Sequence, residues 1–247
     1  MLELQHISFS AEDENGGNRK EILRDVSLKL EPGFIAVTGP NGGGKSTLAK
    51  IIMGIYKPQQ GKILLNGEDI TELSVTERAR RGISFAFQQP VRFKGLTVND
   101  LIRLSAGRDI SVGDACDYLS QVGLCARDYI NREVNASLSG GELKRIEIAG
   151  VMARGTDVTI FDEPEAGIDL WSFGNLINVF ERMRETLGGT IIIISHQERI
   201  LNIADKVAVI ANGQLKQFGG REEILPELLN VSSACKVLTD NLEGERK

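Results

Sequence analysis

The stretch FIAVTGPNGGGKSTLAKIIMGI, residues 34–55, decides the fold of this chain. Its centre, GPNGGGKST, matches G-x-x-x-x-G-K-[ST] and stands between an apolar strand pattern and a helical pattern. Three successive glycines, at positions 42–44, permit positive φ and let backbone N–H groups close around an anion. The helix that follows directs its positive end at the same point. The stretch therefore predicts a phosphate-binding loop in an α/β protein.

The polar residues of this loop indicate which phosphates it binds. Lys45 supplies a point charge to the β and γ phosphates, and Ser46 offers a hydroxyl ligand to Mg²⁺. A merely flexible glycine turn would explain neither side chain, nor the flanking strand and helix. We predict ATP and Mg²⁺ as cofactors, with the nucleotide bound by Gly39, Pro40, Asn41, Gly42, Gly43, Gly44, Lys45, Ser46 and Thr47.

A cluster of acids follows the apolar run VTIF in the segment IFDEPEAGID, residues 160–169. Asp162 comes directly after this predicted strand, which places its carboxylate at the carboxyl end of a parallel sheet, where ligands bind. We expect Asp162 to be a partner of Mg²⁺. Glu163, one residue further, can reach the attacking water at the γ phosphate, as a base or as a positioning group.

Composition and charge limit the function classes. The chain has 247 residues, 41% of them hydrophobic and 26% charged, and its net charge of -5 argues against a broad nucleic-acid-binding surface. Three scattered cysteines fit a reducing, cytoplasmic location better than a disulfide framework. No apolar run approaches the roughly 20 residues of a membrane helix, so another chain would supply any membrane part. The opening MLELQHISFSAEDE alternates like a first strand and does not resemble a signal peptide.

Short apolar strands alternate with helical patterns, which is typical of a parallel sheet covered on both faces. The predicted central strands are residues 34–38, 83–87, 158–161, 191–194 and 207–210. The middle of the chain has helical spacing and no convincing strand. We predict one domain over residues 1–247, divided into an α/β core (1–89 and 156–225), an inserted helical subdomain (90–155) and a tail (226–247).

A second candidate anion site is LSGGE, residues 138–142, at the start of the helical pattern LKRIEIAGVMA. Ser139, Gly140 and Gly141 would present a hydroxyl and bare N–H groups at a helix N-terminus. Alone, this segment would be interpreted as an ordinary capped helix. Together with the phosphate-binding loop and the acids, it predicts a second half of one nucleotide site.

These motifs, with AFQQP, AGID and ISH in chain order, resemble an ABC-type ATPase over Met1 to about Leu225. The resemblance implies a P-loop NTPase (RecA-like) core of ABC type, with an inserted helical subdomain and an antiparallel β part on the N-terminal side. It also implies a head-to-tail dimer of two copies, in which Ser139, Gly140 and Gly141 contact the partner's ATP. The further implied roles are Gln88 at the γ phosphate and Mg²⁺, His196 at the γ phosphate, and Asp169 at the dimer seam.

Two positions depart from the family pattern. Where many members carry an aromatic residue that stacks on adenine, this sequence has Ala11, with Phe9 nearby. Glu165 stands where transport ATPases often carry a small hydroxyl residue. For Glu165 we weigh a solvated charge at a helix start against a group facing the partner subunit.

Three short segments, FAFQQPVRFKGL, SGGELKRIEI and SHQERIL, resemble the Suf-type iron-sulphur cluster assembly ATPases (SufC). This resemblance implies a SufB/SufD-like scaffold as the partner, docked in a groove near Gln88. The alternative is the nucleotide-binding subunit of an ABC membrane transporter, which would use the same groove to grip a transmembrane permease. Fold and catalytic motifs do not separate these two partners.

Overall fold

The structure is a computed structural model that describes residues 1–12, 19–89, 91–168, 170–186 and 188–228, and only the backbone of residues 170–172. Its main element is a six-stranded sheet with the strand order β10-β9-β3-β8-β7-β6. The strands of this sheet are β3 (Gly33–Thr38), β6 (Ile83–Ala86), β7 (Val158–Asp162), β8 (Thr190–Ile194), β9 (Lys206–Ala211) and β10 (Gln214–Gly220). All five predicted central strands are thus present.

The direction of these strands places the predicted site. β3 pairs in parallel with both β8 and β9, and β7 pairs in parallel with β6 and β8, whereas β10 is antiparallel to β9. The carboxyl ends of β3, β6, β7 and β8 therefore meet at one edge of the sheet. Ligands bind at such an edge in open α/β folds.

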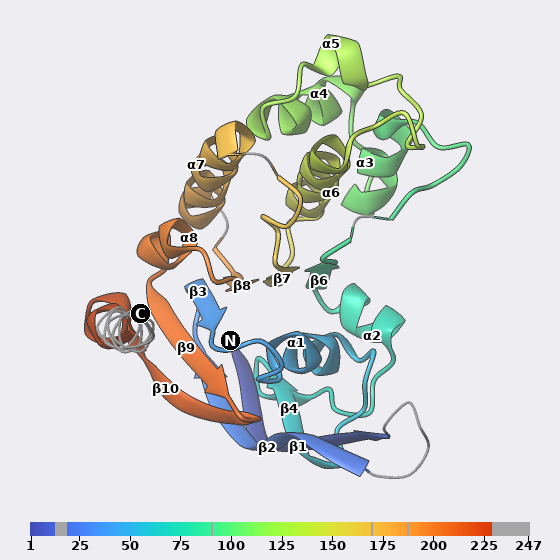
Figure 1. Ribbon diagram of the computed structural model, residues 1–247. Coiled ribbons are helices and arrows are strands. Elements are labelled where there is room, and N and C mark those ends of the chain that lie inside the picture. Colours follow the sequence, from blue (N-terminus) through green and yellow to red (C-terminus); the bar gives the residue numbers. More distant parts are fainter. Residues whose placement is uncertain (13–18, 90, 169, 187, 229–247) are drawn as a thin grey trace, which may run out of the picture.

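A second, antiparallel sheet has the order β2-β1-β4-β5. Its strands are β1 (Leu2–Glu12), β2 (Arg19–Leu30), β4 (Gln60–Leu65) and β5 (Glu68–Asp69). β1 is the strand predicted from the opening alternation. Figure 1 shows this small sheet on the opposite side of the large sheet from helices α3 to α8.

Both faces of the large sheet are buried, and the alternation of side chains along β3 shows how. Phe34 and Ala36 pack into one hydrophobic cluster with helices of the middle and late chain. Ile35 and Val37 pack into another with α1 and the small sheet. The helices are α1 (Lys45–Met53), α2 (Val75–Arg80), α3 (Val98–Ala106), α4 (Val112–Gln121), α5 (Ala126–Tyr129), α6 (Gly140–Arg154), α7 (Leu170–Thr186) and α8 (Glu198–Ile203); residues 221–228 are also helical. The predicted fold class is confirmed.

Helices α3 to α6 occupy the predicted helical region, and three of them begin with a capping box, at Thr97, Ser111 and Ser139. In each, the hydroxyl and a carboxylate three residues later satisfy backbone N–H groups that the helix itself leaves free. Only one isolated bridge, Thr97 to Glu133, has strand geometry in the described part of this region. The division into core, helical subdomain and tail stays a prediction, and residues 229–247 of the tail lie outside the described residues.

Within the described ranges, no helix is long and apolar enough to cross a bilayer.

Candidate nucleotide site

The loop between β3 and α1 is shaped by close packing against β9. A Cβ atom at Gly39, whose φ is +131°, would lie 2.1 Å from the carbonyl oxygen of Ile210. Gly44 precedes α1 with a φ of 105° and offers no side chain to cap the helix. No side chain caps the first N–H groups of α1, and their binding to an anion stays a prediction.

Lys45 is folded back onto its own loop. It is 6% exposed, and its Nζ donates hydrogen bonds to the carbonyl oxygens of Gly39 at 2.7 Å and Pro40 at 3.0 Å. Burial lowers the pKa of Lys45, and the charges of Glu163 and Asp162 oppose that shift. A γ phosphate would offer this buried ammonium group an anionic partner in place of two neutral carbonyls.

Ser46 and Asp162 meet at the carboxyl edge of the sheet, although 116 positions separate them. The Ser46 hydroxyl donates to Oδ1 of Asp162 at 3.0 Å. Burial raises the pKa of Asp162, whose residue is 4% exposed, and the Ser46 hydrogen bond partly offsets that rise. A buried carboxylate beside a hydroxyl is an oxygen donor set that fits Mg²⁺, and a cation there would hold Asp162 ionised.

Glu163 lies within reach of two predicted site residues. Gln88 Nε2 donates to Oε2 of Glu163 at 2.5 Å, which leaves the Gln88 side-chain oxygen free to face a metal. His196 Nε2 is 3.9 Å from Oε1 of Glu163, and burial, with the charge of Lys45, lowers the pKa of His196. Glu163 also has a φ of +46°, uncommon for a residue other than glycine. The structure thus brings Gln88, Glu163 and His196 together.

Lys45, Ser46, Gln88 and Glu163 line a cleft of about 940 Å³. Residues of the phosphate-binding loop, with Gln88 and Glu163, form one side of it. The rest of the lining comes from β2 and from the turn after β9: Lys20, Glu21, Ile22, Arg24, Asn212 and Gly213. β2 carries no motif that would predict this wall, and only the position of β2 beside the loop reveals it.

Ala11 occupies the position where an adenine-stacking residue was expected, and Phe9 lies nearby. Phe9 stacks on Tyr56 with ring centroids 5.2 Å apart, so Tyr56 covers one face of its ring. Ala11 pairs with Lys20 across β1 and β2, and it is Lys20 that reaches the cleft lining. In this chain, the wall on that side of the cleft is built from β2 side chains.

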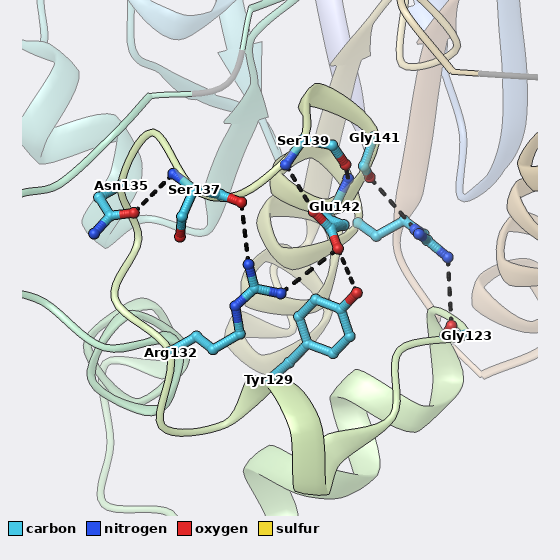
Figure 2. Close-up of polar contacts among 9 residues, drawn as sticks. Gly123, Tyr129, Arg132, Asn135, Ser137, Ser139, Gly141 and Glu142 are labelled. Carbon is cyan, nitrogen blue, oxygen red and sulfur yellow. Dashed lines mark hydrogen bonds and ion pairs between the residues drawn. The ribbon is translucent and has the colours of Figure 1, made fainter.

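LSGGE forms the start of α6, and Figure 2 shows the hydrogen bonds that fix it. The Ser139 hydroxyl accepts from the N–H of Glu142 at 3.3 Å, and the Ser139 N–H donates to Glu142 Oε2 at 2.6 Å. The Tyr129 hydroxyl also donates to Glu142, and Arg132 lies 3.7 Å from the same carboxylate. Burial alone would raise the pKa of Glu142, but the hydrogen bonds from Tyr129 and Ser139 outweigh it and lower that pKa. Tyr129 and Arg132 were not predicted from sequence.

The two glycines of LSGGE differ from those of the phosphate-binding loop. A Cβ atom added at Gly140 or Gly141 would meet nothing within 4 Å, and neither residue has positive φ. Their own chain therefore does not require them to be glycine. Neither crowding by the described chain nor backbone conformation therefore explains these two glycines.

Glu165 points into the fold, which excludes one of the two roles predicted for it, that of a solvated charge. Its carboxylate accepts a hydrogen bond from the Ser195 hydroxyl, and its Oε2 is fully buried. Burial raises the pKa of Glu165, with the Ser195 hydrogen bond acting in the opposite direction. The prediction of a solvated charge at a helix start is wrong, because the chain folds this carboxylate inward against the residue before His196. Asp169, the predicted seam residue, lies outside the described residues.

Two known proteins that resemble this chain are described as ATP-binding proteins of transporters. The profile of the ABC transporter family matches residues 23–166. An uncharacterised ABC transporter ATP-binding protein of Methanocaldococcus jannaschii is 40% identical over 217 residues, covering 84% of this chain and 86% of the relative. A molybdate/tungstate import ATP-binding protein of Thermococcus kodakarensis is 34% identical over 208 residues, covering 82% of this chain and 62% of the relative.

A solved structure supports the same fold. It is a dimeric ATP-binding cassette in a post-hydrolysis state bound to ADP and phosphate, with a TM-score of 0.80 at 22% identity. The match covers 90% of this chain and 99% of the solved one.

Proposed function

Because this chain belongs to the ABC transporter family, we propose that it is an ATP-hydrolysing subunit that dimerises around ATP and drives a membrane-embedded partner. One observation carries the proposal: Lys45, the Ser46–Asp162 pair and the Gln88–Glu163 pair share one edge of one sheet. These are the groups needed to bind phosphates, hold a metal and orient water. A location in the cytoplasm, beside the membrane, follows from this role.

Each residue has a distinct part in this proposal. Lys45 leaves the carbonyls of its loop for the β and γ phosphates, and the N–H groups at the start of α1 bind the same oxygens. Ser46, Asp162 and the oxygen of Gln88 would hold Mg²⁺, which would supply positive charge beside the phosphates. Glu163 orients the attacking water and accepts its proton.

His196 has a lowered pKa and is therefore neutral near pH 7. A neutral imidazole beside Glu163 can donate one hydrogen bond to the γ phosphate without forming a competing ion pair with the carboxylate. We assign His196 to the γ phosphate on this ground.

A second copy completes the site. One chain supplies a cleft open on one side, and the unpacked glycines at the start of α6 offer a surface that a second chain's nucleotide can approach. In a head-to-tail dimer, Ser139, Gly140 and Gly141 contact the partner's ATP, and Asp169 lies at the seam. Each dimer then holds two nucleotides between two chains.

The partner docks beside Gln88. An apolar cavity of about 280 Å³ opens there, between the large sheet and helices α3 and α6. Three large apolar side chains in its lining are exposed: Phe87 at 41%, Val91 at 51% and Phe93 at 39%. Exposed apolar side chains around a cavity are typical of protein-binding surfaces, and a short helix of a transmembrane permease fits this chemistry. Both curated relatives are described as ATP-binding proteins of transporters, which favours this partner.

A Suf-type scaffold of the SufB/SufD kind is the second candidate partner. The segments FAFQQPVRFKGL and SGGELKRIEI support it, because both lie beside the same cavity, where a scaffold would bind. The names of the relatives do not point to cluster assembly.

Two experiments test the proposal. Glu163→Gln keeps the shape of the side chain and removes the base, so ATP still binds while hydrolysis falls by about 100-fold or more and dimers accumulate. Hydrolysis at the wild-type rate in this variant would contradict the assigned role. Co-purification from the native cell tests the partner: a polytopic membrane protein supports transport, whereas a soluble scaffold protein supports cluster assembly.

A further inference from the structure

Phe87, the residue immediately before Gln88, is held at both of its backbone polar groups by α6. Its N–H donates to Oε1 of Glu147 at 3.1 Å, and its carbonyl oxygen accepts a hydrogen bond from Lys144 Nζ. Lys144 Nζ also lies 3.1 Å from Oε2 of Glu147. The three residues form a closed set of contacts, which we call the Phe87 clamp.

The clamp is built from charges that are costly to bury. The Lys144 side chain is 1% exposed and that of Glu147 is 19% exposed. Burial raises the pKa of Glu147, while the nearby Lys144 charge acts against that rise. A buried ion pair is often no more stabilising than apolar residues of the same volume, so its presence here calls for a reason other than stability.

The position of the clamp supplies such a reason. α6 begins at Gly140, directly after Ser139, and Lys144 lies five residues beyond Ser139, about 7.5 Å along the helix axis. On the opposite side of the clamp from α6, Gln88 follows Phe87 in the chain, and its side-chain amide donates a hydrogen bond to Glu163. Direct contacts therefore connect the Ser139 end of α6 to Glu163 within one chain, by way of Phe87 and Gln88.

We infer that Lys144 and Glu147 are positioning residues that lock the loop of Gln88 to α6. A displacement of α6, produced when Ser139 meets the nucleotide of a second copy, then moves Gln88 and reorients Glu163 in the same chain. The inference rests on the proposed function, because it assigns a coupling role within that ATPase dimer. It also places the clamp within reach of the partner, since Phe87 and Glu147 line the apolar cavity.

The test removes the clamp while keeping the core filled. The double variant Lys144→Met with Glu147→Leu replaces a buried ion pair by apolar side chains of similar volume, which offsets the loss of two hydrogen bonds to the Phe87 backbone. The thermal midpoint should therefore stay within about 5 °C of that of the wild type. Misplacement of Gln88 should lower kcat for ATP hydrolysis by about ten- to a hundredfold. The affinity of the single chain for ATP without Mg²⁺ should stay within about twofold, because Lys45 and its loop are untouched and Gln88 is assigned to the metal.

A matched control neutralises an exposed ion pair between α3 and the loop that follows it. Arg103 and Asp109 lie 2.9 Å apart, and the double variant Arg103→Gln with Asp109→Asn should leave kcat unchanged. Glu147→Gln is the conservative variant: it keeps an oxygen for the Phe87 N–H, so its kcat should fall by less than that of the double variant. A stable double variant with wild-type kcat, or equal losses in Glu147→Gln and the double variant, would overturn the inference.

Amide hydrogen exchange separates this inference from the proposed function. Loss of the clamp should speed exchange at the Phe87 amide in the nucleotide-free chain, where no hydrolysis occurs. Unchanged exchange at Phe87 in the double variant would show that no clamp exists. A wild-type chain that fails to hydrolyse ATP would instead contradict the proposed function and leave the exchange result standing.

Discussion

The two glycine-rich helix starts of this chain, at α1 and at α6, look alike in sequence but differ in what shapes them. At the loop before α1, a Cβ on Gly39 would lie 2.1 Å from the backbone of β9, so the chain's own packing demands glycine. At the start of α6, Gly140 and Gly141 have open space around them. The first site is shaped by the packing of the chain itself, whereas no described part of the chain crowds the second.

Replacing one glycine by alanine at each site, which adds a Cβ atom, tests this contrast most directly. Gly39→Ala should destabilise the fold by about 3 kcal/mol, because the methyl group collides with a backbone carbonyl that no rotamer can move. Urea unfolding measures the change. Stability close to that of the wild type would mean that β9 yields easily and that the loop is not fixed by its own chain.

Lys45→Ala tests the chemistry of the first site. The variant loses charge-assisted hydrogen bonds to the phosphates, so the ATP affinity of the single chain should fall by roughly ten- to a hundredfold. Equilibrium titration with ATP and Mg²⁺ measures this, and Ser139→Ala is the control, since its hydroxyl is assigned to the nucleotide of another chain. Equal losses in both variants would remove the distinction between the two sites.

Gly141→Ala should separate folding from assembly at the second site. With no neighbour within 4 Å of the new methyl group, the free energy of unfolding should stay the same or rise by up to about 1 kcal/mol. Dimerisation with ATP in the Glu163→Gln background should weaken by about tenfold, because the methyl group holds the partner's nucleotide away from the helix N-terminus. Sedimentation analysis measures it; undiminished dimers would argue against a nucleotide at this site.

Tyr129→Phe probes how the second site is held. Removing the hydroxyl that donates to Glu142 should cost about 1 kcal/mol of stability. The pKa of Glu142 lies below its ordinary value in the fold, so its stabilising effect is complete above the unfolded pKa and is lost as pH falls through the folded one. The wild type should therefore lose more stability than the variant between about pH 5 and pH 3. Parallel losses would show that Tyr129 does not set the state of Glu142.

The sequence predicted the parts of the site that follow local rules. Strand bounds, the loop at α1 and the acids after β7 could all be placed, because apolar runs, glycines and carboxyl ends of strands have fixed geometric consequences. The Asn66-Gly67 and Asn212-Gly213 turns have positive φ at both positions, which Asn-Gly hairpin turns require.

Features that join residues distant in the chain could not be predicted from the sequence. The β2 wall of the cleft, the inward carboxylate of Glu165 and the Phe87 clamp all join residues that are distant in the chain. Lys144 and Glu147 look like an ordinary charged pair on a helix until the fold covers them. Burial turns such a pair from a solvated face into a fixed contact.

The sequence by itself determined the local features, namely a glycine-rich loop predicted to bind phosphate, an acid predicted to bind metal and a second glycine-rich helix start, because each depends on neighbours within a few residues. Only the tertiary structure decided which side chains meet: Ser46 with Asp162, Gln88 with Glu163, and α6 with Phe87. The physical reason is that local geometry is set by backbone dihedrals and residue type, whereas contacts across the sheet depend on strand order and burial.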